Sequence, residues 1–254
     1  MNLELGVDNR GLAYGDGLFE TCRVRRAVVP WLDRHLARLR RGAEVLRLDW
    51  RSIESGLHEE LADLLAQSPD VDWVKLIVTR VADGRGYAPS TSAACRYWQT
   101  GTLAHATDHV SIARCVEVSA ENPTLAGLKH LNRLPEVLAT GGPEVREERL
   151  LVDPQGRLIS ATSANVFLVI GEEIVTPTNS RRGVEGVMAA WVCEQVPVQS
   201  RGIAKGLVSL ASECFLTNAL RGIVSVDRIG DQRFALDTPV ANALRSQLSS
   251  SSWA

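Results

Sequence analysis

The sequence predicts an α+β protein with two domains, a small N-terminal α/β domain and a larger C-terminal domain built on a mixed, barrel-like sheet. The chain of 254 residues is 45% hydrophobic and 23% charged. This is an ordinary globular composition, and the length suits one large domain or two modest ones. The second half carries many short strand-like segments and few helical ones, which favours a mixed sheet over a doubly wound one.

Strand and helix patterns follow one another in the first half. Residues 18–24 alternate loosely in hydrophobicity and are rich in strand formers, and 27–31 has the pattern of a hairpin return. From Asp33 the apolar spacing changes to three and four, which predicts an amphipathic helix of about four turns. The remaining elements expected here are a helix over 53–67 and strands over 71–81 and 95–98.

The hydrophobic pattern lapses at 104–109, which predicts a linker between a first domain over 1–103 and a second domain over 110–254. In the second domain we expect strands at 110–116, 148–152, 165–170, 174–176 and 214–217, with helices near 130–139, 185–194 and 205–211. Residues 249–254 show no pattern that would bury them, so they are expected to form a disordered tail.

Composition excludes several classes of function. A net charge of −2 without a long basic block argues against a nucleic-acid-binding protein, so a small molecule is the expected partner. The five cysteines and five histidines show no metal-ligand spacing, which predicts no metal site and reduced thiols in a cytoplasmic protein. No window approaches the ~20 apolar residues of a membrane span.

Lys129 is the strongest candidate for covalent chemistry. It is one of three lysines among 28 basic residues and stands at the mouth of an apolar run, just before a predicted helix. Apolar surroundings and a helix N-terminus favour the neutral, nucleophilic amine. A solvated lysine in a helix-entry loop would show the same spacing, so the pattern leaves both interpretations open.

Four further segments have the composition of anion sites. The glycine-flanked turn at 181–187 leads into a helix, and Thr217 with Asn218 ends a strand with hydroxyl and amide donors. Arg38 lies on the first helix, and Arg85 lies on a glycine-hinged loop that could present it to a carboxylate. Ordinary turns and a solvated basic helix face are the alternatives.

Taken together, five motifs resemble one known family. They are GLAYGDGLFET at 11–21, HLARL at 35–39, GRGY at 84–87, LAGLKHLNRL at 125–134 and LTNALRGI at 216–223. In this order they resemble the fold-type IV pyridoxal-phosphate enzymes, the class IV aminotransferase family. The first motif is shared across the fold type, whereas the lysine segment and GRGY are more similar to its 4-amino-4-deoxychorismate lyase branch than to its aminotransferases.

The resemblance implies pyridoxal 5'-phosphate as cofactor, a homodimer, and conversion of 4-amino-4-deoxychorismate into 4-aminobenzoate and pyruvate for folate synthesis. It makes Lys129 the residue that binds the cofactor covalently and moves the proton. The groups implied for the phosphate are Arg38, the backbone of Val184, Glu185 and Gly186, and the side chains of Thr217 and Asn218. Those implied beside the cofactor ring are Ser163 and Asn165, and those facing the substrate are Arg85, Tyr87 and Arg133.

Two departures from the family pattern stand out. Ser160 occupies the position of the glutamate that normally pairs with the pyridine nitrogen, and most of the strand that usually precedes the first motif is missing. A hydroxyl leaves that nitrogen neutral and the ring a weaker electron sink, which suits elimination better than transamination. Two rivals remain: a D-amino-acid or branched-chain aminotransferase of the same fold, and a cofactor-less relative kept as a binding module.

Overall fold

The computed structural model describes residues 6–81, 86–103, 109–118, 122–142, 147–178, 182–235 and 238–253. The chain divides into two compact units, Met1–Ala104 with Leu128–Asn132, and His105–Gly127 with Arg133–Ala254. No helix among the described residues is long and apolar enough to cross a membrane.

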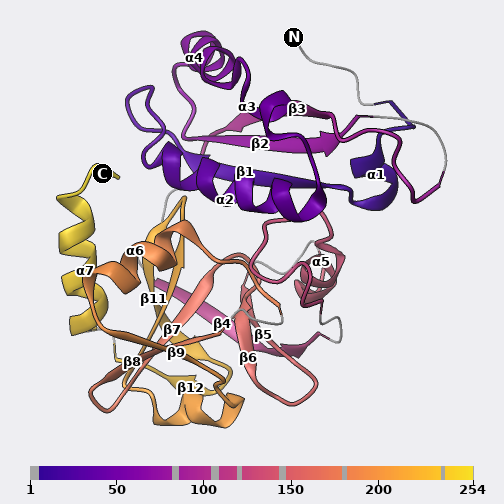
Figure 1. Cartoon of the computed structure of the whole chain (residues 1–254). Coiled ribbons are helices and arrows are strands. Elements are labelled where there is room, and N and C mark those ends of the chain that lie inside the picture. Colours follow the sequence, from indigo (N-terminus) through magenta and orange to yellow (C-terminus); the bar gives the residue numbers. More distant parts are fainter. Residues whose placement is uncertain are drawn as a thin grey trace. The chain divides into compact units, whose positions relative to one another are not determined.

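The first unit holds a three-stranded antiparallel sheet in the order β1-β2-β3, flanked by helices (Figure 1). Alternate side chains of β1 and β2 are buried against the helices. Leu18 and Val78 belong to one apolar cluster, and Cys22 and Val74 belong to a second cluster. Its elements are α1 (Arg10–Tyr14), β1 (Gly17–Arg23), α2 (Leu32–Leu46), α3 (Trp50–Glu54), α4 (Leu57–Gln67), β2 (Trp73–Arg80) and β3 (Ala94–Gly101).

Two local expectations for this unit need correction. The single helix expected over 53–67 is two helices, because Gly56 adopts a left-handed φ of 72° between α3 and α4. The segment 27–31 is not a sheet strand. Arg25 and Val28 close a tight turn, and β1 pairs instead with β2.

The second unit is built on a nine-stranded mixed sheet in the order β6-β5-β4-β11-β10-β7-β8-β9, with β12 paired to β11. The β4–β5, β4–β11 and β8–β9 pairs are parallel and the others are antiparallel. The elements are β4 (His109–Glu117), α5 (Leu134–Ala139), β5 (Glu148–Val152), β6 (Leu158–Ala161), β7 (Asn165–Ile170), β8 (Glu173–Pro177), α6 (Val187–Gln195), β9 (Val198–Arg201), the 3-10 helix η1 (Lys205–Leu210), β10 (Glu213–Asn218), β11 (Gly222–Ile229), β12 (Gln232–Arg233) and α7 (Pro239–Ser249).

The expected α+β class and mixed sheet are confirmed. The two units divide between Ala104 and His105, within the expected linker, but one later segment belongs to the first unit. Leu128–Asn132 belongs to the first unit because it adds to the free edge of β1, where Phe19 N donates to Lys129 O and Leu131 N donates to Gly17 O. The C-terminal tail also differs from its expectation. Trp253 is buried, and its Nε1 donates to Ala219 O at 3.2 Å.

Candidate active site

Lys129 lies on the short segment that pairs with β1 in the first unit. Because Phe19 N bonds to Lys129 O, the two side chains share one face, and Lys129 Nζ lies 4.3 Å from the centre of the Phe19 ring. Lys75 Nζ, from β2, lies 5.0 Å from the centre of the same ring. The half-buried lysine therefore rests against the face of an aromatic ring.

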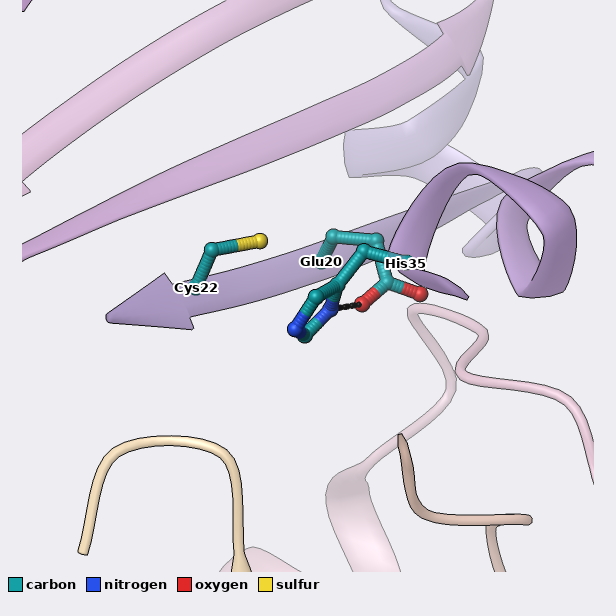
Figure 2. A group of neighbouring side chains, drawn as sticks. All are labelled: Glu20, Cys22 and His35. Atoms are coloured by element: carbon teal, nitrogen blue, oxygen red, sulfur yellow. Dashed lines mark hydrogen bonds and ion pairs between the residues drawn. The ribbon is translucent and has the colours of Figure 1, made fainter. Parts of the chain in front are cut away.

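Arg38 is buried on the inner face of α2 and is bonded to Glu20 of β1. Arg38 Nε donates to Glu20 Oε1 at 2.8 Å and Nη2 donates to Oε2 at 2.5 Å, and His35 Nδ1 lies 2.7 Å from Oε2. Figure 2 shows the Glu20 carboxylate facing the His35 imidazole. Burial alone would raise the pKa of the Glu20 carboxyl, but the charge and hydrogen bond of Arg38, with His35, lower it to about 2.

Glu20, Cys22 and His35 place three possible metal-ligand atoms within 4.8 Å of one another (Figure 2). Their chemistry favours the ion pair over a metal. Both Glu20 oxygens already accept hydrogen bonds from Arg38, and burial raises the pKa of the Cys22 thiol well above its ordinary value, so the thiol stays protonated.

A set of donors gathers in the second unit where β7 and β10 meet the start of α6. Thr217 pairs with Asn165 across the two strands, and Asn165 Nδ2 donates to Val184 O at 2.8 Å. Gly186 is the N-cap of α6, and a Cβ there would lie 2.0 Å from Asn165 Oδ1, so this close approach requires glycine. Thr217 Oγ1 is buried and has no hydrogen-bond partner among the described residues.

Glu148 ties together the two turns beside this set. It accepts hydrogen bonds from Thr162 Oγ1, Ser163 Oγ and Ser163 N, and it pairs with Arg221 Nη2 at 2.7 Å. Asn218 Nδ2 also donates to Ser163 O, at 3.4 Å, and so joins the same two turns. The structure therefore brings all the expected cofactor residues of this unit except Ser160 into one neighbourhood, namely Ser163, Asn165, Val184, Glu185, Gly186, Thr217 and Asn218.

Ser160 lies in β6, half-buried and paired with Leu151 of β5. Two other glutamates of this unit, Glu213 and Glu185, lie in different settings. Glu213 accepts hydrogen bonds from Val240 N and Ala241 N in the first turn of α7, and Glu185 is exposed beside Gly127.

The expected substrate residues are less clearly placed. Arg85 lies outside the described residues. Tyr87 is exposed, its carbonyl oxygen accepts a hydrogen bond from Arg10 Nη2, and its ring meets that of Tyr14 edge-on. Arg133 falls in the second unit at the start of α5, where Glu136 Oε1 pairs with it at 3.2 Å. A second arginine, Arg182, bonds to the same oxygen at 3.2 Å.

Sequence reasoning missed Glu20 and Glu148. The alternating burial of β1 carried a signal for Glu20, because Leu18, Glu20 and Cys22 share a face. Nothing local marked Glu148, since its partners lie 14 to 73 residues away along the chain.

Comparison with known proteins identifies the family. The model of the amino-transferase class IV family matches residues 17–229. The chain belongs to this family. The resemblance found in the motifs is therefore confirmed.

Two similar proteins are lyases by name. A 4-amino-4-deoxychorismate lyase structure from Pseudomonas aeruginosa is 34% identical, with a TM-score of 0.86 over 98% of this chain and 96% of that one. An aminodeoxychorismate lyase of Vibrio harveyi is 27% identical over 94% of this chain and 92% of its own. At the level of fold alone, a PLP-bound hypothetical aminotransferase from Mycobacterium tuberculosis matches with a TM-score of 0.78 at 17% identity, covering 98% of this chain and 93% of that one.

Proposed function

We propose that the protein is a pyridoxal-phosphate-dependent lyase that converts 4-amino-4-deoxychorismate into 4-aminobenzoate and pyruvate. The observation that carries this is the near full-length similarity to lyases of that name. The KHLNR and GRGY segments, which resemble the lyase branch more than the aminotransferases, support it. A homodimer and a cytoplasmic location belong to the same proposal.

The donors of the second unit suit the cofactor. Thr217 Oγ1 is buried and has no partner in the part of the chain that the structure describes. Such a hydroxyl costs free energy unless an acceptor reaches it, and a phosphate supplies that acceptor. The backbone of Val184, Glu185 and Gly186 leads into the N-terminus of α6, which favours an anion. In the first unit Arg38 contributes the cationic partner. We expect Ser163 and Asn165 to lie beside the ring.

Proton transfer is assigned to Lys129. When bound, pyridoxal phosphate withdraws electrons from the substrate amine carbon. Lys129, in its neutral form, takes the proton from ring C4. The carbon–oxygen bond at C3 then breaks, the enolpyruvyl oxygen leaves with the bonding electrons, and the ring becomes aromatic. The departing enolpyruvate takes up a proton at its methylene carbon and becomes pyruvate, which balances the proton taken from C4. Arg85, Tyr87 and Arg133 are proposed to bind the substrate, whose carboxylates suit arginine.

Ser160 is proposed to face the pyridine nitrogen as a neutral partner. Elimination gains aromaticity as the leaving group departs, so it needs a weaker electron sink than transamination does. A serine at this position therefore favours the lyase over an aminotransferase.

The direct test combines product analysis with labelling of the lysine. Purified protein with pyridoxal phosphate should release equal amounts of 4-aminobenzoate and pyruvate from 4-amino-4-deoxychorismate. Borohydride reduction and peptide mapping should place the pyridoxyl group on Lys129. Label on Lys75 or Lys205 would refute the site. Amino transfer that depends on a keto acid would support the aminotransferase rival, and a colourless protein that binds no cofactor would support the binding module.

A further inference from the structure

The arginine proposed to bind the cofactor phosphate already has a buried anion of its own. Glu20 and Arg38 are 1% and 6% exposed, and two of the five guanidinium N–H groups of Arg38 donate to the carboxylate. His35 Nδ1 lies against the same carboxylate, which keeps Glu20 oriented toward α2.

Glu20 remains ionised throughout the physiological pH range, because its pKa is about 2. Arg38 also remains charged. The pair is therefore neutral as a whole, and a phosphate dianion placed against Arg38 would lie near a second negative charge. Cys22, on the same face of β1, adds no negative charge, because burial raises the pKa of its thiol and keeps it protonated.

We propose that Glu20 is the resident counter-ion of Arg38, stabilising the buried guanidinium in the cofactor-free protein and competing with the cofactor phosphate for its charge. This inference rests on the proposed function. It makes Glu20 a positioning residue whose charge sets how strongly the phosphate contributes to cofactor binding.

Two opposing effects decide the sign of the test. Without the Glu20 charge, Arg38 would be less well oriented, which weakens phosphate binding by the cost of ordering one side chain. Arg38 would also be a buried cation without its carboxylate until phosphate arrives. The loss of a buried cation's carboxylate costs several times more than the ordering of one side chain. The loss of the carboxylate is therefore the larger effect, so removal of the Glu20 charge should strengthen the contribution of the phosphate to cofactor binding.

The experiment compares pyridoxal 5'-phosphate with pyridoxal, which has the same ring and aldehyde but no phosphate. The ratio of their dissociation constants, measured on cofactor-depleted full-length protein by the absorbance of the lysine adduct, isolates the phosphate. Glu20→Gln should raise this ratio about tenfold or more and lower the melting temperature of the cofactor-free protein. A purely structural role would weaken both ligands equally and leave the ratio unchanged, which would overturn the proposal.

The matched control is Glu60→Gln. Glu60 forms the same two-point pair with Arg96 in the same unit, at 3.0 and 2.5 Å, but none of the proposed site residues takes part. We expect it to leave the ratio at the wild-type value.

A second background keeps the test decisive if Glu20→Gln alone does not fold. In an Arg38→Gln protein no cation remains for Glu20 and the phosphate to share, so adding Glu20→Gln should leave the ratio unchanged. A tenfold rise there would refute the proposal, because it would not depend on the charge of Arg38. If wild-type protein binds neither aldehyde, the proposed function fails. If it prefers the phosphate form but Glu20 does not change that preference, only this inference fails.

Discussion

Replacement of Thr217 by valine should make the cofactor-free protein more stable and its cofactor binding weaker. Valine has nearly the same shape and the same β-branched preference for a strand. Thr217 is 1% exposed in the middle of the sheet, and its hydroxyl has no partner among the described residues. The substitution therefore removes an unsatisfied polar atom and breaks no hydrogen bond that the structure records.

The expected magnitudes have opposite signs. A buried hydroxyl without a partner costs about 1–3 kcal/mol, so Thr217→Val should stabilise the cofactor-free protein by about 1–2 kcal/mol. For a chain of this size that is a rise in melting temperature of roughly 2–8 °C. A hydrogen bond to a charged phosphate is worth about 1.5–3 kcal/mol, so cofactor affinity should fall about 10- to 100-fold.

Thermal denaturation of the cofactor-depleted protein and a pyridoxal phosphate titration measure the two effects. Pyridoxal serves as the control ligand and should bind the variant and the wild type equally. A variant that is less stable without cofactor, or that binds the phosphate form as tightly as the wild type does, would show that this hydroxyl does not serve the phosphate.

Four other perturbations test separate parts of the site. Arg85→Ala should lower kcat/KM by an amount equivalent to about 2–4 kcal/mol of lost transition-state stabilisation, while cofactor content stays intact. Unchanged kinetics would mean that GRGY is an ordinary turn. Ser160→Glu should introduce a measurable half-transamination of simple amino acids, and a parent protein that transaminates equally well would contradict the electron-sink argument. Glu148→Gln should lower the free energy of unfolding by about 1–3 kcal/mol and weaken cofactor binding, while the exposed Glu173→Gln should change stability by less than about 0.5 kcal/mol. Because the pKa of Glu20 is lowered from 4.5 to about 2, its ionisation contributes stability above about pH 5 that is lost as the pH falls toward 2. Acid unfolding of Glu20→Gln should show less loss in this window, and an unchanged acid profile would argue against the lowered pKa.

Local patterns were enough for the α+β class and for several strands. The segments 148–152 and 165–170 match β5 and β7, because continuous apolar runs between turns mark buried strands. The four-residue strands β6 and β9 were not predicted, since strands this short carry too little hydrophobic pattern. The strand β11 and the serine- and alanine-containing helix α7 were also missed, and both are recognisable only against the strands they pack on.

The candidate site divides in the same way. Sequence by itself determined the family motifs, the candidate lysine and the unusual serine, because these depend on residue identity and order. Only the tertiary structure decided that Lys129 lies on the edge of β1 against Phe19, and that Arg38 is held by Glu20. The physical reason is that both contacts join residues that are not neighbours in the chain. Such contacts are determined by strand pairing and burial, and no local sequence pattern predicts them.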